Sequence, residues 1–293
     1  MIIIILTPLT LFAQANSLFE NSPKAALNDT AVKKDSVFAP YWTPKAIAGL
    51  NISQLALSNW TQGGDNSITW TLTGDFGYNY KSMTWNFFNS LKVAYGRTKL
   101  GTQDFRTNNN DFYMENVLSY KIGGVVDPFF GNTVRTTVAA GYSYANDQAT
   151  EIANFFDPGY VTQSLGFTYD RLSSFKTRLG IAVQETFANR FRQYTDDIAT
   201  SKIEAFKLET GLQSVTSGNV QLAENLLFSS SLTLFTRFKS LDVWDVRWDN
   251  SIVAKVNNWL NVNLGFLFIY QKDQSPTAQM KQALQLGIVY TIL

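Results

Sequence analysis

Asp245, Arg247 and Asp249 occupy every second position of one stretch of the chain. In an extended strand, residues two apart share a face, so these three side chains are expected to project from the same side. Fixed charges in that arrangement set ion preference when they line a confined, partly desolvated passage. This stretch is therefore the first candidate site, and Lys207 and Glu209 are its expected partners.

Charges of both signs recur at positions that alternate with apolar residues elsewhere in the chain. The further candidates for a shared inner surface are Lys92, Glu115 and Arg135. Two interpretations are open: a network of ion pairs that holds a wall together, or a binding site for a polar solute. The similar numbers of acidic and basic side chains favour the ion-pair network.

The chain contains no histidine and no cysteine. This excludes Ser-His-Asp and Cys-His catalysis, disulfides and thiolate zinc sites. There is also no glycine-rich phosphate loop, so we predict no catalytic, cofactor-binding or metal-binding residues and no enzyme activity. The net charge is +1 and the charges are scattered, which argues against a nucleic-acid partner.

The elements that would position the charges are amphipathic strands. From Ile68 to Tyr80 every second residue is apolar or aromatic except one glycine, over the ~10 residues that a tilted strand needs to cross a bilayer. A mean hydropathy of −0.09 does not contradict this, because alternation hides an oily face from an average. The pattern predicts twelve strands, at 46–58, 67–80, 84–96, 111–123, 133–144, 160–171, 175–187, 203–214, 220–236, 242–256, 260–270 and 280–292.

Such strands predict an all-β fold, a closed antiparallel transmembrane β-barrel with short periplasmic turns and longer extracellular loops. The expected turns are 81–83, 172–174, 215–219 and 257–259, and the expected loops are 97–110, 145–159, 188–202 and 271–279. The connection 124–132 is long for a turn and 237–241 is short for a loop, so 10 or 14 strands are the alternatives. A soluble β-sandwich is a further alternative.

Aromatic residues fall near the predicted strand ends, where amphipathic rings favour the membrane interface. The expected girdle comprises Trp85, Tyr95, Tyr120, Tyr144, Tyr169, Trp244, Trp259, Tyr270 and Tyr290. Between the girdles, lipid-facing residues are expected on every strand. Examples are Ile181 on 175–187 and the set Val134, Val138, Tyr142 and Tyr144 on 133–144.

The first fifteen residues form an apolar segment that ends at Ala13-Gln14-Ala15, as a signal peptide does. Its basic region is missing, which suggests a truncated start; a buried hydrophobic strand is the alternative. Residues 16–45 show neither helical nor strand periodicity and are predicted to be a largely disordered periplasmic leader. The barrel is predicted to span 46–293.

The stretch Leu57-Ser58-Asn59-Trp60-Thr61-Gln62-Gly63-Gly64-Asp65-Asn66-Ser67, with Tyr95-Gly96 further on, resembles a family of exported β-barrel proteins of unknown function from Gram-negative bacteria. The resemblance implies an outer-membrane location reached through a signal peptide, and it implies no activity. The expected partners are outer-membrane lipid, the barrel-assembly machinery and other envelope proteins. The chain departs from the usual assembly signal because it ends in Leu293 rather than an aromatic residue, which leaves Tyr290 as the recognition residue.

These observations predict a narrow passive channel for small polar solutes. The alternative is a closed barrel that serves as a structural or interaction component of an envelope complex. A barrel enzyme ranks below both.

Overall fold

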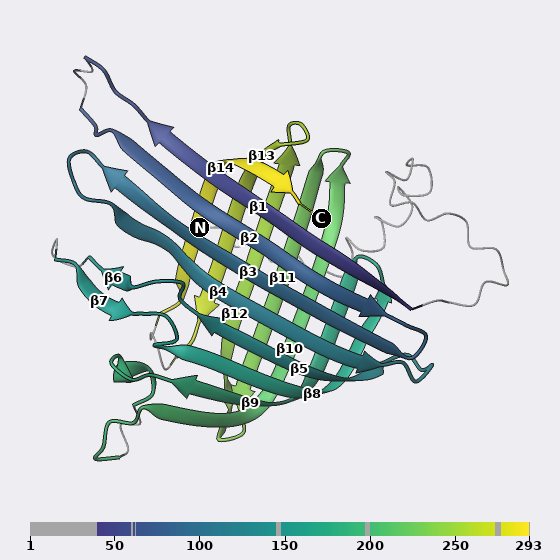
Figure 1. The fold of residues 1–293 in the computed structure, drawn as a ribbon. Helices are drawn as coiled ribbons and strands as arrows, with labels where there is room; N and C mark the ends of the chain where they lie inside the picture. The colour runs from purple at the N-terminus through teal and green to yellow at the C-terminus, as the bar shows by residue number, and fades with distance from the viewer. Residues whose placement is uncertain are drawn as a thin grey trace, which may run out of the picture. The chain divides into compact units, whose positions relative to one another are not determined.

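The computed structural model describes residues 40–292 except 60, 62, 145–147, 197–199 and 273–276. This part of the chain forms a closed antiparallel barrel of twelve strands (Figure 1). The barrel strands are β1 (Tyr41–Leu55), β2 (Ser67–Lys81), β3 (Trp85–Leu100), β4 (Arg106–Tyr120), β5 (Asp127–Thr136), β8 (Gly159–Leu172), β9 (Phe175–Phe187), β10 (Phe206–Ala223), β11 (Leu226–Arg237), β12 (Ser240–Lys255), β13 (Leu260–Tyr270) and β14 (Gln279–Thr291). The connection from β5 to β8 carries a hairpin of β6 (Gly141–Ser143) and β7 (Thr150–Ala153), and the helix η2 covers Arg192–Tyr194.

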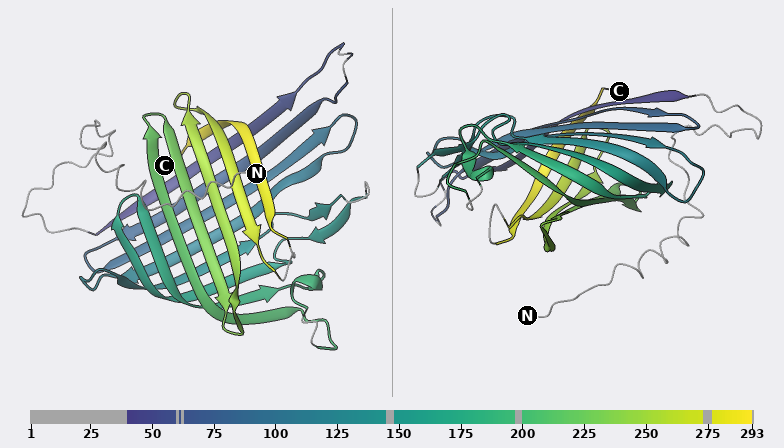
Figure 2. Two further views of the ribbon diagram at one scale, coloured as in Figure 1. Left: turned by 180° about the vertical axis from the view of Figure 1, so that it is seen from behind. Right: turned by 90° about the horizontal axis from the view of Figure 1, so that it is seen from below.

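The barrel closes because β1 pairs with both β2 and β14. Ala48 lies opposite Gly74 on one side and opposite Tyr290 on the other. The strands of one wall cross those of the opposite wall obliquely (Figures 1 and 2). This is the tilt that closure of a sheet into a barrel requires.

Strict alternation gives the wall two different surfaces. On β9, Leu179 and Ile181 are 58% and 56% exposed, whereas Ala182 is only 3% exposed. The exposed set is apolar and faces outward, and its neighbours on the next strands are apolar as well, as in the pairs Leu165–Ile181 and Leu212–Ile181. The fold is therefore a transmembrane β-barrel, as the alternation predicts. Buried inward side chains such as Phe129 and Val117 form a core along β4 and β5.

Connections differ between the two ends of the barrel. At one end, here called the turn end, the connections are 82–84, 121–126, 173–174, 224–225 and 256–259. At the other, the loop end, they are 56–66, 101–105, 137–158, 188–205, 238–239 and 271–278. Five of these six are longer than the two-residue turns at the turn end. The exception is 238–239, which lies within the connection 237–241 that the sequence predicts to be short for a loop.

The first strand begins earlier than predicted, since β1 already starts at Tyr41 and pairs with β2 along its whole length. The predicted boundary at residue 45 between leader and barrel is therefore wrong. Trp42 stacks on Tyr78 with ring centroids 4.5 Å apart, so an outward aromatic contact holds this segment to the wall. The predicted signal peptide, 1–15, and leader residues 16–39 lie outside the described residues.

The predicted strand 133–144 is wrong at both ends. β5 occupies Asp127–Thr136 because Asp127 and Pro128 already pair with β8, and the preceding turn is 121–126. Tyr142 belongs to the β6–β7 hairpin and Tyr144 follows it, so neither is on a barrel strand. Both tyrosines pack at the loop end, and the prediction that they face lipid is incorrect.

The predicted turn at 215–219 is also wrong, because these residues lie in the middle of β10. Val215-Thr-Ser-Gly-Asn has the composition of a turn, yet its backbone pairs with β9 and β11 on its two sides as far as Gly218. Two complete ladders outweigh the weak local preference of serine and glycine for turns. The actual turn, 224–225, lies several residues further on.

Within the described ranges, no helix is both long and apolar enough to cross a membrane.

Candidate functional site

At the loop end of the lumen, Arg237 bridges two carboxylates. Its Nε donates to Glu209 at 2.5 Å, and its Nη2 donates to Asp245 at 2.9 Å. Lys207 lies 3.1 Å from Glu209 on the same strand face. The side chains of Arg237, Glu209 and Asp245 are only 12%, 11% and 7% exposed. We call Lys207, Glu209, Arg237 and Asp245 the loop-end network.

Tight backbone packing positions Arg237. Arg237 is the last residue of β11 and lies opposite Ser240, the first residue of β12, at a register shift. Only residues 238 and 239 connect the two strands. Gly211 of β10 lies directly opposite Arg237, and a Cβ there would come within 1.9 Å of the Thr236 carbonyl oxygen. The small residue thus lets β10 and β11 approach closely beneath the guanidinium group.

A second set of charges joins strands that are not neighbours in the barrel. Arg135 of β5 is 3.5 Å from Asp111 of β4, and Arg247 of β12 is 3.7 Å from Asp249. Asp111 and Arg135 both act electrostatically on Arg247, although β12 is distant from β4 and β5 in the strand order. Lys281 of β14 lies within electrostatic range of Asp111, Arg247 and Asp249. We call Asp111, Arg135, Arg247, Asp249 and Lys281 the mid-lumen cluster.

The two sets differ in their access to water. The Asp249 side chain is 56% exposed and that of Asp111 is 39% exposed, in contrast to the buried carboxylates of the loop-end network. Water therefore reaches the carboxylates of this cluster. With three bases and two acids, this cluster carries a formal charge of about +1.

Several contacts join strands that are not neighbours and so reach across the lumen. Arg178 of β9 donates to Glu115 of β4. Lys176 of β9 lies 5.7 Å from the ring centroid of Phe88 on β3, and Lys281 of β14 donates to the Asn108 carbonyl of β4 at 2.9 Å. These contacts narrow the lumen at more than one level.

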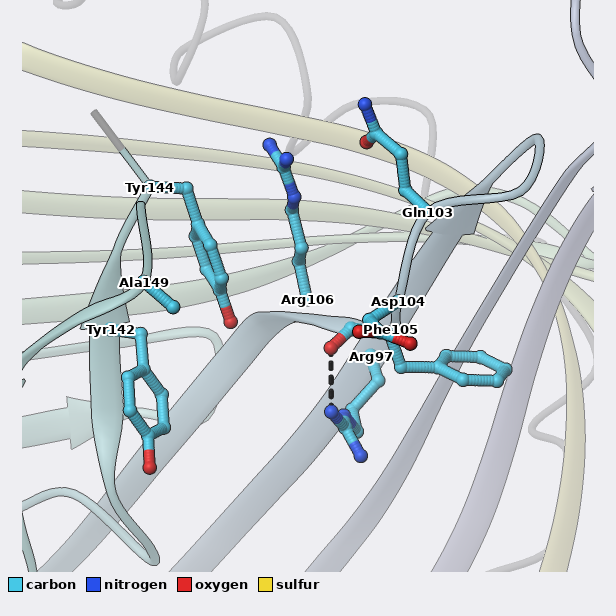
Figure 3. A pocket seen from close by; sticks show the side chains of 8 residues that line it. All are labelled: Arg97, Gln103, Asp104, Phe105, Arg106, Tyr142, Tyr144 and Ala149. Atoms are coloured by element: carbon cyan, nitrogen blue, oxygen red, sulfur yellow. Dashed lines mark hydrogen bonds between the residues drawn. The ribbon is translucent and has the colours of Figure 1, made fainter. Parts of the chain in front are cut away.

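A pocket of about 500 Å³ lies at the loop end, between the β3–β4 connection and the β6–β7 hairpin (Figure 3). Arg106 lies 5.0 Å from the ring centroid of Tyr144, and the Tyr144 hydroxyl accepts a hydrogen bond from the Thr107 amide. Arg97 donates to the Phe105 carbonyl at 2.5 Å. Guanidinium and phenol groups together suit an anionic or polyhydroxylated solute. No cluster of acidic side chains placed to hold a metal ion occurs in the part of the chain that the structure describes.

The structure brings together Asp245, Lys207 and Glu209, as predicted, but through Arg237, which was predicted to lie in the connection 237–241. Asp245 therefore pairs with Arg237 rather than with Arg247, which lies two residues further along the same strand face. Asp111, which was also missed, lies four residues before Glu115 and shares its face, so period two could have identified it. Lys92 lies opposite Asp75 on the neighbouring strand β2, at an inward position.

Most of the predicted girdle residues lie at outward positions near strand ends. Trp85 and Tyr120 pair across β3 and β4 with ring centroids 4.8 Å apart at the turn end. Trp259 lies in the turn 256–259 rather than on a strand. Of the others, Tyr169, Tyr290, Tyr95, Trp244 and Tyr270 are on β8, β14, β3, β12 and β13, and Tyr144 is the exception described above.

Residues 52–142 match the model of a family described as a protein of unknown function (DUF3078), which is less than half of the chain. No curated protein matches the sequence. The translocator domain of autotransporter NalP from Neisseria meningitidis is similar at 10% identity over 96% of this chain and 92% of that chain, with a TM-score of 0.34. The COG4313 outer membrane channel from Pseudomonas putida F1 is similar at 11% identity over 89% and 98%, with a TM-score of 0.40. An anion-selective porin from Comamonas acidovorans gives 10% identity over 87% and 100%, with a TM-score of 0.31. At these TM-scores the likeness carries no argument about function.

Proposed function

We propose that this protein is a narrow passive channel for small polar solutes in the outer membrane of a Gram-negative bacterium. The observation that carries the proposal is the mid-lumen cluster, in which Asp249 and Asp111 are open to solvent although they lie inside the wall. The apolar outward surface, with aromatic residues at its edges, supports the membrane location. Short connections would then face the periplasm.

The contacts across the lumen support a narrow passage rather than a wide one. Arg178–Glu115 and Lys176–Phe88 lie toward the turn end, where they would form a constriction below the mid-lumen cluster. A solute would pass fixed charges of both signs before reaching this constriction. Such a lining suits small polar molecules and ions.

The same contacts favour a second candidate function. If the constriction excludes water, the barrel is closed and serves as a structural or interaction component of an envelope complex. Conductance separates the two functions, because only an open lumen passes ions.

The experiment is single-channel recording of the refolded protein in planar lipid bilayers. We expect a small conductance that rises in Lys176→Ala, which removes the side chain over Phe88. Arg190→Ala is the matched control, because Arg190 lies in the connection 188–205 and pairs with Glu151 of the β6–β7 hairpin, and its side chain is 60% exposed. Zero conductance in wild type and in Lys176→Ala would favour the closed barrel.

Selectivity tests the mid-lumen cluster. Arg247→Ala leaves two bases and two acids in the cluster, so the reversal potential in a salt gradient should shift toward cation preference. Asp249→Asn should shift it toward anion preference. Unchanged reversal potentials in both variants would mean that these charges do not line the conducting path.

A further inference from the structure

Four side-chain amides lie side by side on the outward surface of four successive strands. Asn89 of β3 pairs with Asn116 of β4, Asn116 with Asn132 of β5, and Asn132 with Gln163 of β8. We call these four residues the amide row. Neighbouring strands are ~4.8 Å apart, so the row is ~14 Å long.

The register shows that the amide row faces outward. One step toward the turn end lies the row Phe87, Leu118, Phe130 and Leu165. Its members Phe130 and Leu165 are 50% and 57% exposed, while the intervening inward Gly131 and Ser164 are buried. One step toward the loop end lies Leu91, Met114, Val134 and Val161. The amide row is therefore a polar strip on the outward surface, with an apolar row on each side.

Only part of the hydrogen-bonding capacity of the row is used within the chain. Asn89 donates to the Asn116 side-chain oxygen at 2.7 Å. Among the described residues, no partner is found for the side chains of Asn132 and Gln163, both of which are partly exposed. A carboxamide that faces hydrocarbon without a partner costs free energy, because lipid offers neither donors nor acceptors.

We propose that the amide row is the centre of an interface between two copies of this protein within the membrane. Each carboxamide carries both a donor and an acceptor, so the row is complementary to itself, as a twofold interface requires. The row and its two flanking rows contain no charged side chain, so two copies meet without repulsion. This inference does not depend on whether the lumen conducts.

Symmetry selects the residues that meet. The amide row is inclined to the membrane normal. When a twofold axis along the normal relates two copies, their two amide rows face each other and cross, so contact is closest at the middle of each row. Asn116 and Asn132 occupy that position and would face their counterparts in the second copy. Phe130 and Leu165 would pack around the crossing point and exclude lipid from it.

The first test uses disulfide formation, which is free of background because the chain contains no cysteine. Asn132→Cys in membrane vesicles should give a cross-linked dimer on mild oxidation. Leu284→Cys is the matched control, since Leu284 is an outward residue of β14, on a strand that does not carry the row, and is 65% exposed. It should remain monomeric at the same protein density.

The second test measures the dimer without cross-linking, by energy transfer between labelled copies at graded protein-to-lipid ratios. Asn132→Leu should weaken association about tenfold, as loss of intramembrane amide hydrogen bonds predicts. Gln282→Leu removes an outward amide from β14 and should leave association unchanged. Heat-modifiable migration in SDS verifies that each variant is folded.

A monomeric wild type at all ratios, or a dimer that neither cross-links through Asn132→Cys nor weakens in Asn132→Leu, would overturn the proposal. Cross-linking of Asn132→Cys to a different protein in native membranes would also overturn it, and would assign the surface to that partner.

Discussion

Removal of Arg237 should destabilise the barrel strongly. Arg237→Ala deletes the hydrogen bonds donated to Glu209 at 2.5 and 3.4 Å and to Asp245 at 3.2 and 2.9 Å. Both carboxylates stay buried, and Lys207 remains 3.1 Å from Glu209. Breaking a buried ion pair by removing one partner costs about 3–5 kcal/mol. Because Lys207 still compensates Glu209 in part, we expect Arg237→Ala to lower the free energy of unfolding by about 3 kcal/mol.

The measurement is denaturant unfolding in lipid vesicles, followed by tryptophan fluorescence. Lys45→Ala is the control, because its ion pair with Asp75 is 45% and 32% exposed and should contribute less than about 1 kcal/mol. Neutralising the carboxylates with Glu209→Gln and Asp245→Asn in the Arg237→Ala background should restore much of the loss. Equal small losses for Arg237→Ala and Lys45→Ala would refute the reasoning, since burial would then have no effect.

Three further predictions concern facing, packing and titration. Ile181→Arg should cost about 2–4 kcal/mol if it lies near the bilayer midplane, and spin labels at 181 should report lipid while labels at Ala182 do not; the reverse would invert the register. Gly166→Ala should lower the unfolding free energy by about 1–3 kcal/mol, because its Cβ would lie 2.1 Å from a carbonyl oxygen of β9, whereas Gly265→Ala, with nothing within 4 Å, should change it little. Burial raises the pKa of Tyr194 above its ordinary 10.0. The neutral phenol should therefore stabilise the folded state below pH 10, and this stabilisation should be lost as the pH rises through the folded-state pKa. The absorbance titration of wild type minus that of Tyr194→Phe measures this pKa, and a midpoint at or below 10 would contradict the prediction.

Alternation along the chain was sufficient to predict the barrel, its twelve strands and the inward side of Asp245, Arg247 and Asp249. Ile181 and Ala182 could be assigned to opposite faces because period two is a local property of extended backbone. The absence of histidine and cysteine restricted the chemistry in the same direct way. These conclusions need no knowledge of which strands are neighbours.

Only the tertiary structure decided where strands end and which charges meet. Val215–Asn219 has the composition of a turn but stays extended because two ladders bind it, and Tyr144 leaves the wall because β5 pairs with β8 from Asp127 onward. Arg237 reaches Glu209 and Asp245 through the register of three strands, and Arg178 reaches Glu115 across the lumen. Such contacts join residues far apart in sequence, so their partners follow from strand register and barrel closure rather than from any local pattern.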